Sequence, residues 1–144
     1  SLHPELPKGE VIYVDSDTTK RSYSSLEIGK DSLIWYNYEN DLTDNSLFTS
    51  IEKITMAFKD IDTARIETTE ADIELTTGGS IHTTGFFVRA INEEKRIKSI
   101  EYACNNQTAE QNNYDIQTCN IATTNIETAK RLVERLKTHL TKKP

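Results

Sequence analysis

The stretch TNIETAKRLVERLKTHL, residues 124–140, decides the fold class of this chain. Its apolar residues recur at helical spacing and form one stripe, made of Ile126, Ala129, Leu132, Val133, Leu136 and Leu140. Thr124 followed by Glu127 matches a capping box, in which each side chain satisfies a backbone donor of the other. The pattern therefore predicts one amphipathic helix over 125–140 that buries its stripe against a sheet.

The residues before this helix are short runs of β-branched and aromatic residues separated by polar turns. Arg21–Ile28 and Ser32–Glu39 flank a three-residue connection that contains glycine, which predicts a β-hairpin. We expect Asn40–Ser46 to be a polar loop. A chain of 144 residues fits a single domain, so we assign an extended arm to residues 1–9 and one domain to 10–144.

Several other segments carry strand signals. Within 48–67 the pattern predicts one strand, a tight break at Asp60–Thr63 and a second short strand. Phe86–Ile91 and Arg96–Cys104, joined by the polar turn Asn92–Lys95, are typical of a further hairpin. The fold class is therefore mostly β: an antiparallel sandwich or partly open barrel of about seven strands, capped by the C-terminal helix.

Strict alternation marks one more strand. Ala71, Ile73 and Leu75 alternate with polar residues, and two consecutive glycines follow shortly after. Such alternation indicates a half-buried strand, in which one face is buried and the other is solvated.

Two cysteines, Cys104 and Cys119, are too few for a disulfide scaffold and have the wrong spacing for a zinc site. If Arg96–Cys104 and Tyr114–Ala122 pair as a hairpin with Cys104 opposite Cys119, the pair has the separation that a disulfide needs. Two buried free thiols are the alternative reading. A bridge would indicate an exported protein, and free thiols a cytoplasmic one.

Net charge and pI restrict the classes of partner. The chain carries a formal charge of −6 and has a pI of about 5.1, which disfavours nucleic acid and anionic membrane surfaces. The cations of the first hairpin, Lys20, Arg21 and Lys30, are the one cluster that we single out as a candidate anion-binding site.

No motif in the sequence indicates catalysis, a metal or a cofactor. His3, His82 and His139 are scattered, without the spaced ligands that a metal site needs. The pairs Asp15/Asp17 and Asp60/Asp62 lack the continuation of a calcium loop, so we interpret them as acids that form turns. We therefore assign no catalytic, metal-binding or cofactor-binding residue.

The order of elements resembles the pleckstrin-homology-like (PH-like) superfold over roughly residues 20–140. The resemblance lies in the first hairpin, in a strand and turn at Ile54–Asp62, in the paired later strands and in the closing helix. Two features of inositide-binding PH domains are not matched in this sequence. Their basic pattern around the first hairpin is reduced to the three cations above, and the single tryptophan, Trp35, lies in a predicted strand and not in the helix. A lipocalin-like barrel is the alternative architecture, but its N-terminal Gly-x-Trp motif is absent.

The function that these observations favour is a non-catalytic binding module for a protein or peptide, engaged at an open sheet edge or in a groove beside the helix. A carrier of a small apolar ligand is the first alternative, and it predicts a hollow interior. Weak binding of lipid headgroups by the first-hairpin cations is the second.

Overall fold

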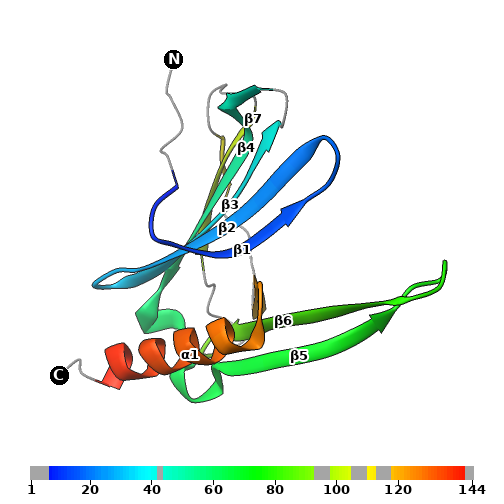
Figure 1. Ribbon diagram of the computed structural model, residues 1–144. Coiled ribbons are helices and arrows are strands. Elements are labelled where there is room, and N and C mark those ends of the chain that lie inside the picture. Colours follow the sequence, from blue (N-terminus) through cyan, green and yellow to red (C-terminus); the bar gives the residue numbers. More distant parts are fainter. Residues whose placement is uncertain (1–6, 42–43, 93–97, 105–109, 113–117, 142–144) are drawn as a thin grey trace.

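A computed structural model describes residues 7–41, 44–92, 98–104, 110–112 and 118–141 of the chain (Figure 1). Within these residues the strands form two antiparallel sheets. The larger sheet has six strands in the order β1 (Glu10–Ser16), β2 (Lys20–Ile28), β3 (Ser32–Asp41), β4 (Asp44–Ala57), β7 (Lys98–Cys104) and β8 (Glu110–Asn112). The smaller sheet has three strands in the order β5 (Glu67–Glu74), β6 (Ser80–Arg89) and β9 (Thr118–Thr123).

The sheets do not close into a barrel, and the helix α1 (Ile126–Thr141) follows the last strand. The prediction of a mostly β, antiparallel and partly open fold with one C-terminal helix is confirmed. The predicted first hairpin is confirmed as well, because β2 and β3 pair along their length and the backbone N–H of Gly29 donates to the carbonyl of Ser32 at the turn.

The helix begins one residue later than the sequence predicted. Its N-cap is Asn125, whose side-chain oxygen accepts the backbone N–H of Thr128 at 2.8 Å. Asparagine is among the strongest N-cap residues, and Thr124 is otherwise engaged, since its N–H donates to the carbonyl of Ile12 at 2.8 Å. The capping box predicted from Thr124 is therefore wrong, although the helix itself is confirmed.

The core lies where both sheets and the helix meet. Phe86 and Ile121 of the smaller sheet are fully buried, as is Leu33 of the larger sheet, and the helix contributes Leu132 and Leu136 at 1% exposure. Each such side chain stabilises the fold by about 1.5–3 kcal/mol relative to an exposed one. The predicted helical stripe thus supplies one wall of this core.

Several predicted boundaries are corrected by the pairing. The expected loop at Asn40–Ser46 is mostly strand, because β3 runs to Asp41 and β4 starts at Asp44. The short strand expected after Asp60–Thr63 is a 3-10 turn at Thr63–Arg65, and the next strand starts at Glu67. Local strand propensity correctly predicted that a strand follows this break. It could not predict that the chain passes here from the larger sheet, which contains β4, to the smaller sheet, which contains β5.

The second predicted hairpin is wrong. β6 pairs with β9, and β7 pairs with β4, so the chain crosses between sheets where the turn Asn92–Lys95 was expected. The register expected for the cysteines fails for the same reason: Cys104 lies opposite Ser50 in one sheet, and Cys119 lies opposite Val88 in the other. Cys119 is a buried free thiol.

The extended N-terminal segment predicted at residues 1–9 falls mostly outside the described residues. Of its nine residues, only Pro7, Lys8 and Gly9 are described, and they precede β1. Gly9 has a φ of +88°, and a Cβ there would lie 2.3 Å from the carbonyl oxygen of Leu26. Only glycine therefore allows the chain to enter β1 so close to β2.

Candidate binding surfaces

The hairpin of β5 and β6 extends well beyond the body of the molecule (Figure 1). We call its distal part, residues 70–83, the arm; every one of these residues is exposed. The arm ends in a turn at Gly78 and Gly79, whose φ values of +93° and +83° lie in the region that favours glycine. The same strand β6 becomes fully buried at Phe86, where the body begins.

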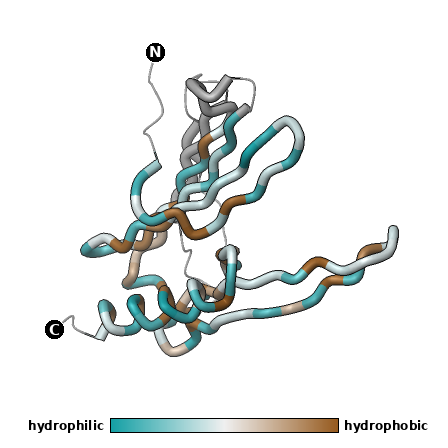
Figure 2. The backbone as a smooth tube through the Cα atoms, viewed as in Figure 1, coloured by the Kyte–Doolittle hydropathy of each residue, from teal (hydrophilic) through white to brown (hydrophobic). Residues whose placement is uncertain are grey.

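One face of the arm is apolar. Ile73, Leu75 and Ile81 are 51%, 41% and 49% exposed, and Ile73 lies directly opposite Ile81 in the pairing register. Figure 2 shows hydrophobic stretches on the arm, away from the packed body. The alternation at Ala71, Ile73 and Leu75 predicted a half-buried face; the strand is confirmed, but its apolar face is not covered.

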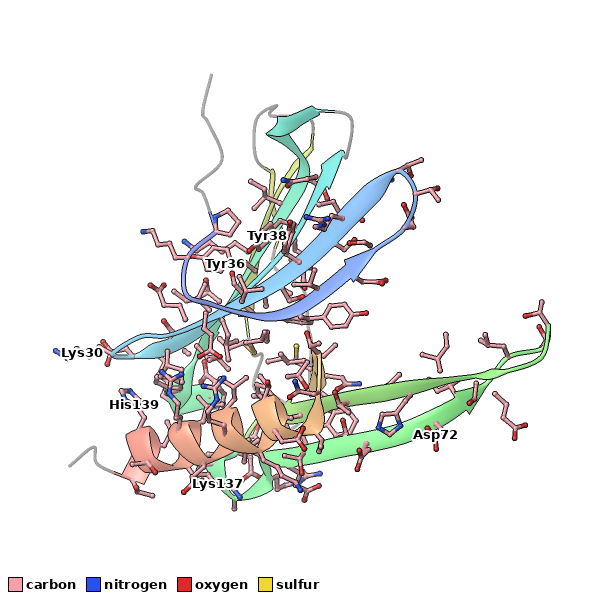
Figure 3. All side chains as sticks on the ribbon, in the orientation of Figure 1. Lys30, Tyr36, Tyr38, Asp72, Lys137 and His139 are labelled. Atoms are coloured by element: carbon pink, nitrogen blue, oxygen red, sulfur yellow. The ribbon has the colours of Figure 1, made fainter. Side chains whose placement is uncertain are left out.

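The other face of the arm is acidic. Glu70, Asp72 and Glu74 alternate with the apolar residues of β5, and His82 of β6 lies between two of them. Its Nδ1 is 2.7 Å from Asp72 Oδ1, and its Nε2 is 2.9 Å from Glu70 Oε2 (Figure 3 labels Asp72). The hydrogen bonds to these two carboxylates raise the pKa of His82 above its ordinary value.

The arm also has an unpaired sheet edge. β5 is the terminal strand of its sheet, so only one of its sides is paired within the described residues. The N–H of Leu75 donates to the carbonyl of Gly79 across the hairpin. Because backbone groups of successive residues alternate in direction along an antiparallel ladder, the N–H and C=O groups of Glu70, Asp72 and Glu74 point away from β6.

A row of polar side chains crosses the larger sheet. Ser24 Oγ donates to Asn37 Oδ1 at 2.6 Å, and Asn37 Nδ2 donates to Glu52 Oε1 at 3.2 Å. By register these residues share a sheet face with core residues such as Leu26. They line a pocket of about 270 Å³. The three side chains are thus linked to one another by two hydrogen bonds.

Cys119 lies near this row. Burial, with a smaller contribution from the charge of Glu52, raises the pKa of Cys119 to about 12. A thiol in such surroundings stays protonated and is a poor nucleophile. Its burial agrees with the alternative of a buried free thiol at this position.

A second pocket lies beside the helix. It has a volume of about 470 Å³ and is bounded by Ile28 of the larger sheet and by residues of α1, namely Arg131, Glu134, Arg135, Thr138 and His139. The two arginines already have a partner, because both contact the carboxylate of Glu10. The hydrogen bond from Arg131 lowers the pKa of Glu10. The sequence predicted one candidate docking surface in a groove beside the helix, and this pocket lies there. Its two arginines, however, already contact Glu10 of β1.

The three cations predicted as an anion site are not brought together. Lys20 and Arg21 lie at the start of β2, and Lys30 lies in the turn beyond its other end. A strand of this length separates them by about 30 Å. Figure 3 labels Lys30 at the turn that follows β2. Lys20 and Arg21 also have local partners, Glu39 at 3.8 Å and Ser16 Oγ at 3.1 Å.

Two of the four paired acids bind nearby backbone. Asp17 accepts the backbone N–H groups of Thr19 and Lys20, and Asp62 accepts that of Ala64, so both act in turns as interpreted from the sequence. Asp15 differs from that interpretation, because it lies within β1. Over the described part of the chain no group of three or more His, Cys, Asp or Glu side chains could hold a metal ion. Around His82 each carboxylate contacts a different ring nitrogen, so their oxygens do not converge. His3 lies outside the described residues.

Comparisons with protein families, with curated proteins and with solved structures give no match for this chain. In the described segments no helix has both the length and the apolar character needed to cross a membrane.

Proposed function

We propose that this chain is a non-catalytic, PH-like binding module that engages a protein or peptide by adding its strand to the edge of β5. The strongest support comes from the arm. The alternating sequence of β5 is typical of a strand with one buried face, yet its apolar side chains are exposed, and they lie beside an unpaired sheet edge. An added strand would receive main-chain hydrogen bonds from β5 and would pack side chains along it.

The energetics of the arm favour a covering partner. A two-stranded ribbon without a packed face is marginally stable in water. Ile73 and Ile81 are each about half exposed, and burial of a side chain of this size contributes up to about 1.5–3 kcal/mol. A third strand would supply that burial and satisfy the outward backbone groups of β5, and both effects would order the arm.

The PH-like architecture is supported by the arrangement of elements. Strands β1 to β4 form a consecutive meander, the hairpin β5–β6 starts a second sheet, and the helix closes the open sandwich as the last element. In this arrangement the sheet edges at the opening of the sandwich stay accessible to a partner. The fold alone carries no specific function, so the proposal depends on the arm.

The two alternative functions have weaker support. A carrier of a small apolar ligand needs a hollow interior, whereas the space between the sheets is filled by core side chains such as Phe86, Leu33 and Met56. Binding of lipid headgroups needs converging cations, whereas β2 separates Lys20 and Arg21 from Lys30. The unpaired edge and the uncovered face of the arm are therefore the stronger basis.

Edge addition can be tested by removing one backbone N–H that β5 directs away from β6. Glu74→Pro removes an outward N–H of β5 without removing a ladder hydrogen bond to β6, and proline is tolerated in this position of an edge strand. Glu74→Gln is the matched control, because it removes the same charge and keeps the N–H. A photo-crosslinking amino acid at Ile81 reports contacts of the arm in extract from the native source.

We expect one predominant adduct at Ile81 that persists in Glu74→Gln and disappears in Glu74→Pro. The same crosslinker at Lys130, on the exposed face of α1, should not form it. An adduct that survives Glu74→Pro, or that forms equally at Lys130, would overturn edge addition at β5.

A further inference from the structure

We infer that the partner strand of β5 is an extended cationic segment of another protein, in which lysine or arginine alternates with apolar residues. This inference rests on the edge addition proposed above and specifies the chemistry of the occupant. It follows from the two faces of the arm, because a strand added to a sheet edge places its side chains alternately on the same two faces.

The acidic face fixes one half of the pattern. Glu70, Asp72 and Glu74 follow one another on the same face of β5, and all three are exposed. His82 lies beside them, and its two ring nitrogens contact Asp72 and Glu70. Side chains of an added strand on this face lie about 4.5–5.5 Å from those of β5. Opposite charges are stabilising at that separation, and like charges are destabilising.

The apolar face fixes the other half. On this face an added strand lies beside Ala71, Ile73 and Leu75, and Ile81 is the next neighbour across the hairpin. Charged side chains there would lose solvation without gaining a partner, whereas apolar side chains would cover the exposed isoleucines. The strand that fits both faces therefore alternates cationic and apolar residues over about four to six positions.

A second copy of this chain is a poor occupant. If two β5 strands paired edge to edge, Glu70, Asp72 and Glu74 of each strand would lie on the same face of the joined sheet as those of the other. Acids would then face acids along that face, which is destabilising. The acidic edge thus acts against self-association, as charges on edge strands commonly do, and it leaves a cationic strand as the complementary partner.

The probe for this inference is a labelled twelve-residue peptide of alternating lysine and valine, capped at both ends. One control peptide has the same composition with the lysines and valines arranged in pairs, and another alternates glutamate and valine. We expect the alternating lysine peptide to bind the full chain, as measured by fluorescence anisotropy, with affinity that falls as salt rises from 50 to 200 mM. The two control peptides should bind at least about tenfold more weakly, because their charges or their spacing do not match β5.

The matched protein variants remove three acids each. Glu70→Gln/Asp72→Asn/Glu74→Gln removes the acidic face of the arm, and Glu27→Gln/Glu127→Gln/Glu134→Gln removes the same charge elsewhere. The first variant should weaken peptide binding about tenfold or more, and the second less than about threefold, the size expected for screened, distant charges.

The following results would overturn the inference. Equal weakening by the two triple variants would mean that the peptide responds to net charge alone. Equal or tighter binding of the glutamate peptide or the paired peptide would mean that the pattern is wrong. A dimer of the free chain in sedimentation at micromolar concentration, lost in Glu74→Pro, would make the second copy the occupant.

These outcomes are distinguishable from failure of the proposed function. If the Ile81 adduct is lost in Glu74→Pro while the triple arm variant leaves binding of the alternating lysine peptide unchanged, edge addition stands and the cationic chemistry is wrong. If the adduct survives Glu74→Pro, edge addition itself is wrong.

Discussion

The hairpin of β5 and β6 contains two regions with the same secondary structure and opposite surroundings. At its base, Phe86 and Val88 are fully buried against the helix and the larger sheet, whereas at its arm Ile73 and Ile81 are about half exposed. Strand pairing is continuous through both regions. Phe86 and Val88 lie on the face of the hairpin that also carries His82, whereas Ile73 and Ile81 lie on the opposite face, which no described residue covers along the arm. The difference shows that an alternating strand needs a covering element before its apolar face stabilises the fold.

The largest contrast should appear when large side chains are truncated in each region. Phe86→Ala should lower the free energy of unfolding by about 3–5 kcal/mol, since it leaves a cavity in the core. Ile81→Ala, five residues earlier on the same strand, should change it by less than about 0.5 kcal/mol. Urea denaturation followed by circular dichroism measures both. Similar losses at the two positions would show that the arm packs against the body in solution.

The chemistry of Cys119 gives a second measure of the packed region. Because its pKa is raised to about 12, its thiolate fraction near pH 8 is roughly a thousandth of that of an exposed thiol. In a Cys104→Ser background, we expect modification by a thiol reagent to be slower by at least that factor in the folded protein than in urea. Rapid modification without denaturant would place Cys119 in an accessible environment.

Gly85 lies at the boundary between the two regions, and its substitution should have an intermediate effect. A Cβ at this position would lie 2.4 Å from the carbonyl oxygen of Ile121, so Gly85→Ala must push β9 away from β6. We expect a loss of about 1–3 kcal/mol in the free energy of unfolding. Thr83→Ala, on the same face but within the arm, is the control, and it should have a much smaller effect.

The smallest effect should be seen at His82, on the arm itself. Its pKa, measured by NMR titration, should lie above the ordinary histidine value, and Asp72→Asn or Glu70→Gln should lower it. Since the folded-state pKa is raised, the stabilisation is complete below the unfolded-state pKa and is lost as pH rises through the folded-state pKa. Amide exchange in the arm should therefore be slower on the acidic side of this transition after correction for intrinsic rates. An unshifted titration would contradict the contacts of His82 with both acids.

Local patterns predicted the elements of this chain better than their partners. The hairpin at residues 21–39, the strand around Ile73 and the final helix were all predicted from spacing and turn residues, and the structure confirms them. The pairing of β6 with β9, and of β7 with β4, was not predictable in this way. Sheet partners are chosen by long-range packing, and neighbouring strands in the sequence need not pair.

The candidate site was only partly predictable. The sequence placed docking at an open edge or beside the helix, and the alternation at Ala71, Ile73 and Leu75 was noted as a strand. It could not show that this strand is the edge of its sheet, nor that its apolar face is uncovered. The cations selected from the first hairpin were close in the sequence, but a strand holds Lys20 and Lys30 at its opposite ends.

The sequence by itself determined that the chain is mostly β and that its last element is an amphipathic helix, because side-chain period is a local property of a strand or a helix. Only the tertiary structure decided which apolar stripes find a partner. Burial depends on what lies across from a face, so Leu132 and Leu136 of the helix join the core while Ile73 and Ile81 of the arm stay exposed.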